Sequence, residues 1–252
     1  SMDKDHSLQR FDEDIRAIQA RLLAMGGLVE RQLEESVNAL AHGDDEKAED
    51  VTRRERQINR MEVEVDRDCE LILARHHPVA GDLRLVIAIM KASTDLERIG
   101  DEAEKVARMC LRGIENEAAP LLRGPSFSRA SNMASKVRTM VREALDAFAR
   151  LDAEAAYAVC REDKHVNQEY DAIARQCITF MMEDPRSISR AMVLMWVVRS
   201  LERIGDHARN ISEYVIFQVG GEDIRHGGLG HIEDAARSAA TRQLNEPPPP
   251  EV

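Results

Sequence analysis

Residues 96–101 of this 252-residue chain read LERIGD, and residues 201–206 read LERIGD again, 105 positions later. Six consecutive identities among charged and small residues are improbable by chance, so they indicate an internal repeat. The segments before them are related at an offset of 108. The facing positions are Val51 and Val159, Glu55 and Asp163, Ile58 and Val166, Val65 and Ile173, Cys69 and Cys177, and Ile72 and Phe180. The chain is therefore interpreted as two copies of one unit.

Each copy has the composition and spacing of long helices. Four of the 8 prolines lie in the tail, which leaves long stretches without a helix breaker, and apolar residues recur there every three or four positions. The predicted helices cover residues 7–41, 45–75, 81–112, 127–150, 153–182 and 187–218. Asp44 and Asp152 are expected N-caps. With 13 glycines and 4% aromatic residues, the composition argues against an all-β fold.

The predicted fold is all-α, with two tandem, pseudo-symmetric antiparallel three-helix bundles and a flexible C-terminal tail. Ser1 and Met2 resemble a cloning scar. The tail has glycine-rich steps, mixed charge and a proline run, a composition that favours disorder. The expected division is a disordered N-terminus at 1–6, a first bundle at 7–115, a linker at 116–125, a second bundle at 126–219 and the tail at 220–252.

Composition also excludes several functions. The formal net charge of −11 disfavours nucleic-acid binding. The longest apolar runs, 85–90 and 191–198, are far shorter than the ~20 residues of a membrane-spanning helix, so we expect a cytoplasmic protein. The four cysteines form no C-x-x-C pair and are expected to be buried, reduced thiols.

Carboxylates interrupt the apolar stripes that these helices should bury. Glu97 and Asp101 continue the stripe of the third helix, and Glu202 and Asp206 continue the stripe of the sixth. On the second and fifth helices a seam position is taken by Glu55 and by Asp163. Buried charges are costly unless something neutralises them.

A count along the hairpin predicts which of these side chains meet. Asn59 lies 19 residues before Pro78 and Glu97 lies 19 after it, while Glu55 and Asp101 are each 23 residues away. Equal distances from the turn of an antiparallel hairpin mean equal height. Each bundle is therefore predicted to hold a cluster of three carboxylates and one amide.

The second copy repeats this arrangement around Pro185. Asn167 lies 18 residues before the proline and Glu202 lies 17 after it; Asp163 lies 22 before and Asp206 lies 21 after. Oxygen-only clusters suit Mg²⁺, Ca²⁺, Mn²⁺ or carboxylate-bound iron, and lack the Cys and His ligands that zinc prefers.

The alternative is that cations of the chain neutralise the acids without a metal, through Arg98, Arg199, Arg203 or lysines. The repetition of the clusters favours the metal. So do Gly100 and Gly205, because a mid-helix glycine is expected where a ligand or another backbone approaches closely.

Three stretches resemble the PhoU family of bacterial phosphate regulators: HPVAGDLR at 77–84, DLERIGD at 95–101 and LERIGDHARNI at 201–211. The resemblance covers roughly residues 5–217 and implies two similar three-helix bundles whose E(D)-x-x-x-D motifs bind multinuclear metal clusters. The implied metal ligands are Glu55, Asn59, Glu97, Asp101, Asp163, Asn167, Glu202 and Asp206. The implied cofactors are iron, or manganese, magnesium, calcium or zinc by opportunity.

The resemblance also implies a function. It is that of a cytoplasmic, non-catalytic adaptor that regulates phosphate uptake and negatively regulates phosphate-starvation (Pho regulon) signalling. Its partners would be the ATPase subunit of the phosphate ABC transporter and a membrane sensor histidine kinase, so the protein would be peripheral to the inner membrane only through partners. A homodimer is expected. Arg75 and Arg84 flank the first turn and are candidates for partner binding; the alternative is that they form exposed salt bridges.

Two other classes remain open. A ferritin-type di-iron enzyme or iron store is also a helical bundle with inward acids, but it needs a Glu-x-x-His on each of two helices. The match in this sequence is Glu162 to His165, whereas Glu97 and Glu202 have no His three residues on. The second class is a metal-free helical scaffold whose acids are paired with arginines.

Overall fold

The computed structural model describes residues 2–115, 125–220 and 229–245, and within them the chain is almost entirely helical. Its long helices are α1 (Met2–His42), α2 (Asp45–His76), α3 (Ala80–Glu115), α4 (Pro125–Arg150), α5 (Ala153–Glu183), α6 (Ile188–Gly220) and α7 (Leu229–Asn245). A short 3₁₀ helix, η2 (Pro185–Ser187), joins α5 to α6. The first six helices begin and end within a few residues of the predicted bounds, apart from the N-terminus of α1.

Corresponding caps begin the second helix of each copy. Asp44 accepts a hydrogen bond from the backbone N–H of Lys47 at 3.1 Å, and Asp152 accepts one from Ala155 at 3.0 Å. Both caps satisfy backbone donors that a helix start leaves without partners. The two predicted N-caps are confirmed.

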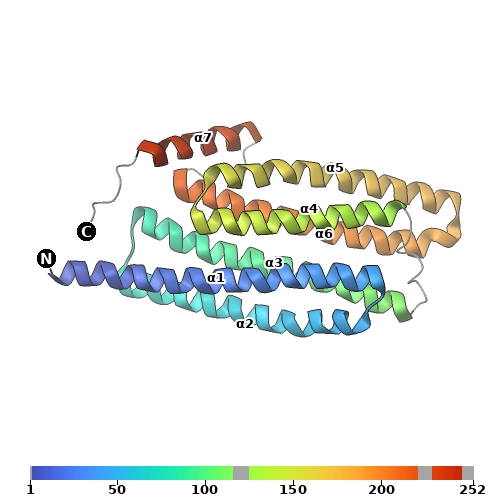
Figure 1. Ribbon diagram of the computed structural model, residues 1–252, viewed down its shortest axis with the longest axis horizontal. Coiled ribbons are helices and arrows are strands. Elements are labelled where there is room, and N and C mark those ends of the chain that lie inside the picture. Colours follow the sequence, from blue (N-terminus) through green and yellow to red (C-terminus); the bar gives the residue numbers. More distant parts are fainter. Residues whose placement is uncertain (1, 116–124, 221–228, 246–252) are drawn as a thin grey trace.

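Two three-helix bundles, α1–α3 and α4–α6, confirm the predicted fold class. They lie side by side, with α3 packed against α6 and α1 against α4 (Figure 1). The α2–α3 turn and the α5–α6 turn lie at opposite ends of the molecule. Apolar side chains of both copies form one continuous core, which includes Met25, Ile99, Met133 and Ile204. The helices that carry the predicted metal motifs are thus the ones at the centre of the molecule.

The contact between α3 and α6 contains a buried polar network. Asp95 of the first copy accepts hydrogen bonds from Asn210 at 3.1 Å and Tyr214 at 2.6 Å, and its Oδ1 lies 2.7 Å from His207 Nδ1. All three partners come from the second copy. Because buried polar groups need matched partners, this network specifies how the bundles sit against each other.

The predicted disorder at the two ends is wrong for most of the residues concerned. Residues 2–6 continue α1 as helix, and residues 229–245 form α7, which packs on α5 and α6. The side chains of α7 that are buried there are Ile232, Ala235, Ala236 and Ala239. Composition alone wrongly predicted disorder for this segment, because α7 obtains its apolar contacts from the second bundle. The predicted linker falls mainly on 116–124, outside the described residues.

None of the described helices combines the length and apolarity needed to cross a bilayer. The four cysteines are buried free thiols, as expected.

Candidate metal centre

Three carboxylates of the first bundle come together between α2 and α3. One oxygen each from Glu55, Glu97 and Asp101 lies within 4.8 Å of the others. Glu97 and Asp101 are one turn apart on α3, and Glu55 faces them from α2. The hairpin count thus correctly predicted that these three side chains meet.

Glu55 is the most buried of the three acids, with a relative exposure of 4%. Its Oε2 accepts a hydrogen bond from Gln32 Nε2 of α1 at 3.1 Å, whereas its Oε1 is buried without a hydrogen-bond partner. A Cβ placed on Gly100 would lie 2.8 Å from Oε2. The glycine therefore leaves room for this carboxylate in the seam.

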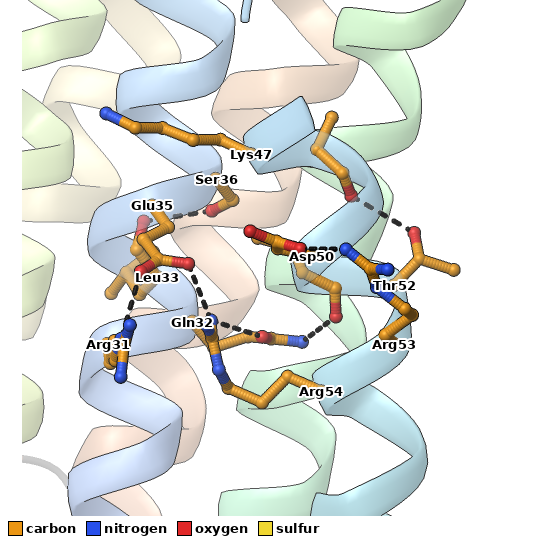
Figure 2. Close-up of polar contacts among 12 residues, drawn as sticks. Arg31, Gln32, Leu33, Glu35, Ser36, Lys47, Asp50, Thr52, Arg53 and Arg54 are labelled. Atoms are coloured by element: carbon orange, nitrogen blue, oxygen red, sulfur yellow. Dashed lines mark hydrogen bonds and ion pairs between the residues drawn. The ribbon is translucent and has the colours of Figure 1, made fainter. Parts of the chain in front are cut away.

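Gln32 is itself held in place by several contacts, and no sequence motif indicated its role. Its Nε2 also donates to the carbonyl of Val51 at 2.8 Å, and its Oε1 accepts from Arg54 at 3.4 Å. Arg54 in turn pairs with Glu35 at 2.8 Å. Figure 2 shows the Gln32 side chain lying between α1 and α2 with Arg54 beside it. This network orients the Glu55 carboxylate toward α3.

The acids of the first bundle repel one another in a poorly hydrated seam. Burial, followed by the charges of Glu104, Glu97 and Asp101, raises the pKa of Glu55 to about 8. Burial and Asp101 raise the pKa of Glu97 as well. A cation among these oxygens would relieve both effects, because it favours the ionised carboxylates.

Two further acids of the first bundle belong to the same surroundings. Glu104 extends the α3 stripe one turn beyond Asp101, so its spacing in the sequence could have predicted its place near the cluster. Glu62 of α2 has its pKa raised to about 7, by burial and then by the charge of Glu97. Asn59, the predicted amide, is exposed. The predicted role of Asn59 as a ligand stays a prediction.

Some of these charges already have cationic neighbours. Lys105 lies 3.4 Å from Asp101, Arg108 lies 2.8 Å from Glu104, and Arg98 lies 3.8 Å from Glu97. All three cations reach the site from the solvent side. The buried Oε1 of Glu55 has no such partner.

In the second bundle, Asp163 of α5 occupies the position of Glu55 and is 1% exposed. Its Oδ1 is buried without a hydrogen-bond partner, as is Oδ1 of Asn167 one turn along. A Cβ on Gly205 would lie 3.2 Å from Asp163 Oδ1. The glycine and the buried acid are thus repeated. Among the residues described, however, the second bundle does not gather three carboxylates as closely as the first.

A cation of the chain takes part in this second cluster. Arg209 Nη1 lies 3.5 Å from Asp163 Oδ2, and Arg209 Nε donates to Glu213 at 2.8 Å. Arg209 is 105 positions after Glu104, so the second copy has a positive charge where the first has a negative one. The spacing of the repeat could have indicated this exchange.

The remaining second-site acids still influence one another. Burial, then the charges of Glu202 and Asp163, raises the pKa of Asp206 to about 7. Burial raises the pKa of Asp163, while Arg209 opposes that rise. Glu202 accepts a hydrogen bond from Arg199 at 3.1 Å. Salt bridges therefore account for part of the neutralisation in this copy.

The other predicted residues lie away from the two clusters. Arg75 and Arg84 are beside the α2–α3 turn; Arg75 is exposed, and the half-buried Arg84 has a buried Nε without a hydrogen-bond partner. His165 is exposed and lies 3.4 Å from Glu162, also outside the apolar seam. The single Glu-x-x-His match is therefore a surface pair.

The first cluster fits a hard divalent cation better than the second. It offers three converging carboxylates, one buried oxygen without a partner and a glycine that leaves space beside it. Such cations take oxygen ligands and keep waters for the remaining positions. The residues that could hold the ion are Glu55, Glu97 and Asp101.

Comparison with known proteins agrees with the duplicated architecture. The PhoU domain matches residues 22–110 and again residues 130–215, one match within each bundle. A phosphate-specific transport system accessory protein PhoU homolog from Pseudomonas aeruginosa is 49% identical over 229 residues, covering 91% of this chain and 93% of that protein. The phosphate-specific transport system accessory protein PhoU of Escherichia coli is 39% identical over 228 residues, covering 90% and 92%.

Two solved structures have the same fold. The crystal structure of PhoU from Pseudomonas aeruginosa superposes with a TM-score of 0.80 at 48% identity, covering 84% of this chain and all of that one. The phosphate transport system regulatory protein PhoU from Streptococcus pneumoniae gives a TM-score of 0.77 at 29% identity, with 84% and 98% covered. The domain matches and the extent of these identities lead to one conclusion: the chain belongs to the PhoU family.

Proposed function

We propose that this chain is a non-catalytic regulator of phosphate uptake that binds a divalent cation through the first carboxylate cluster. The observation that carries the metal-binding part is the group formed by Glu55, Glu97 and Asp101, with a buried Glu55 oxygen that has no partner. The regulatory part is supported by the relatives, which are named accessory proteins of a phosphate-specific transport system.

We further propose that the protein is a cytoplasmic homodimeric adaptor that damps phosphate-starvation signalling. It contacts the ATPase subunit of the phosphate transporter and a membrane sensor histidine kinase. The bound cation neutralises repelling carboxylates between α2 and α3 and so stiffens the helices that present those surfaces.

A pull-down from membranes tests the adaptor role. The tagged full chain is used as bait in cells grown at high and at low phosphate. We expect recovery of the transporter ATPase subunit and the kinase, with the recovered amounts depending on phosphate. Recovery of neither protein in either medium would overturn the adaptor role.

The metal-binding part has its own test, because it can fail separately. Protein purified without chelator is analysed for bound metals, beside the variants Glu97→Ala and Glu202→Ala. We expect bound metal that decreases in Glu97→Ala. A metal content of zero in the wild type would favour a metal-free scaffold. In such a scaffold cationic side chains would neutralise the buried acids, as Arg209 does beside Asp163.

A further inference from the structure

The end of the second bundle, where α5 turns into α6, exposes an unusual number of apolar side chains. Thirteen large apolar residues are exposed in the described chain, and six of them fall between positions 178 and 196. They are Ile178, Phe180, Met182, Ile188, Met192 and Trp196. We call this segment, residues 172–199, the α5–α6 tip. Figure 1 shows it extending beyond the other helices at that end of the molecule.

The exposed residues on α6 form a continuous stripe. Ile188, Met192 and Trp196 are four residues apart, and each is 40–44% exposed, while the core side of the same helix buries Ala191, Val198 and others. On α5, Met182 is 81% exposed just before the turn. Side chains spaced by four lie on one helix face, so this stripe is a surface rather than scattered residues.

The charge of the tip is opposite to that of the chain. Between positions 172 and 199 there are four arginines, Arg175, Arg186, Arg190 and Arg199, against the two acids Glu183 and Asp184. The chain as a whole has a net charge of −11. Arg186 lies 3.0 Å from Asp184 and Arg199 lies 3.1 Å from Glu202, so the excess positive charge of the tip is carried chiefly by Arg175 and Arg190. Since exposed charges are screened beyond about 8 Å at physiological ionic strength, a surface that touches the tip meets this local excess rather than the net charge of the chain.

The first copy lacks this combination. The matching segment, positions 64–94, has four Lys and Arg residues against five acids. Trp196 occupies the place of Lys91, 105 positions earlier. The basic, apolar tip is therefore a property of the second copy alone and does not follow from the repeat.

We propose that the α5–α6 tip docks directly onto an anionic lipid bilayer. Tryptophan favours the headgroup level, apolar side chains enter the boundary between headgroups and acyl chains, and arginines near an anionic leaflet each contribute about 1 kcal/mol. The charge selects this occupant over a second copy of the chain, because a two-fold contact at the tip would bring like-charged arginines together. Such docking would bring the regulator to the membrane without a membrane-spanning helix.

The test uses Trp196, which is the single tryptophan of the chain and lies within the stripe. Full-length protein is mixed with vesicles of phosphatidylcholine alone or of phosphatidylcholine and phosphatidylglycerol in equal parts. With the anionic vesicles we expect a blue shift of tryptophan emission, quenching by brominated acyl chains, and weakening by added salt. The double variant Met182→Glu/Met192→Glu should bind these vesicles about tenfold less tightly, and Arg186→Gln/Arg190→Gln should reduce binding in the same direction.

Val79→Glu is the matched control, since Val79 is an exposed apolar residue at the α2–α3 turn of the first copy. It should leave vesicle binding unchanged. Circular dichroism checks that every variant is folded. An absence of spectral change with anionic vesicles, or an equal change with phosphatidylcholine alone, would overturn the proposal. A blue shift that depends on protein concentration without lipid would instead assign the surface to a second copy.

Discussion

The two bundles place a buried acid and a glycine at matching positions, yet they surround them with different chemistry. Glu55 beside Gly100 corresponds to Asp163 beside Gly205. Glu104 of the first copy is replaced by Arg209, and Gln32, which orients Glu55, is replaced by Met140 at an offset of 108. Met140 Cε lies 3.9 Å from a Cβ placed on Gly205.

Duplication of the backbone therefore does not imply duplication of the site. The first cluster accumulates negative charge, and its buried acid has an oxygen without a partner. The second cluster places a guanidinium beside its buried acid. We therefore expect the first bundle to bind divalent cations more tightly than the second.

The largest effect is expected from exchanging the charges that distinguish the copies. Glu104→Arg should lower the cation affinity of the first cluster by about tenfold or more, because it replaces an attractive charge with a repulsive one. Arg209→Gln should raise the affinity of the second cluster. Isothermal titration calorimetry with Mn²⁺ measures both.

Arg112→Gln serves as a control for the charge exchange, since it also changes a cation on α3 but lies three turns beyond Asp101. It should leave Mn²⁺ affinity as in the wild type. Equal affinities in wild type, Glu104→Arg and Arg209→Gln would refute the charge comparison.

In the metal-free protein, the buried acids of the two copies should lower the free energy of unfolding over different pH ranges. The pKa of Glu55 is about 8 in the folded chain against an ordinary 4.5, and that of Asp206 is about 7 against 3.8. A folded state with a raised carboxyl pKa binds a proton that the unfolded state has lost. The resulting stabilisation is present at low pH and is lost as the pH rises through the folded pKa.

Between pH 7 and pH 8 the loss of stability should therefore come mainly from Glu55. We expect Glu55→Gln to flatten this part of the profile and to stabilise the metal-free protein at pH 8 by about 1 to 3 kcal/mol. Asp206→Asn should flatten only the part below pH 7. Urea unfolding in the presence of chelator measures both, and an unchanged slope between pH 7 and pH 8 in Glu55→Gln would count against the buried repulsion.

The smallest effect is expected at the two glycines. A Cβ at position 100 would lie 2.8 Å from the Glu55 carboxylate, and one at position 205 would lie 3.2 Å from that of Asp163. Gly100→Ala should move the acid and lower Mn²⁺ affinity, but by less than Glu104→Arg does, whereas Gly205→Ala should change the second site less. A larger effect at position 205 would reverse the comparison. Gly27→Ala is a matched control, since nothing lies within 4 Å of its added Cβ.

Much of this architecture could be predicted from the sequence. Helix periodicity and the absence of proline located six helices, and the count from Pro78 brought together Glu55 and Asp101. Local sequence did not identify Gln32, because its role depends on the packing of α1 against α2. The α7 helix was missed although Ile232, Ala235, Ala236 and Ala239 follow helical spacing, because small alanines bury well only against a surface supplied by other helices.

The central claim is that the two clusters differ in cation affinity and that the first is the tighter site. Titration of Mn²⁺, with free ion followed by electron paramagnetic resonance, tests it in wild type, Glu97→Ala/Asp101→Ala and Glu202→Ala/Asp206→Ala. We predict that the tightest class of binding disappears in the first double variant and is retained in the second. Loss of that class in the second variant alone, or its absence from the wild type, would contradict the account.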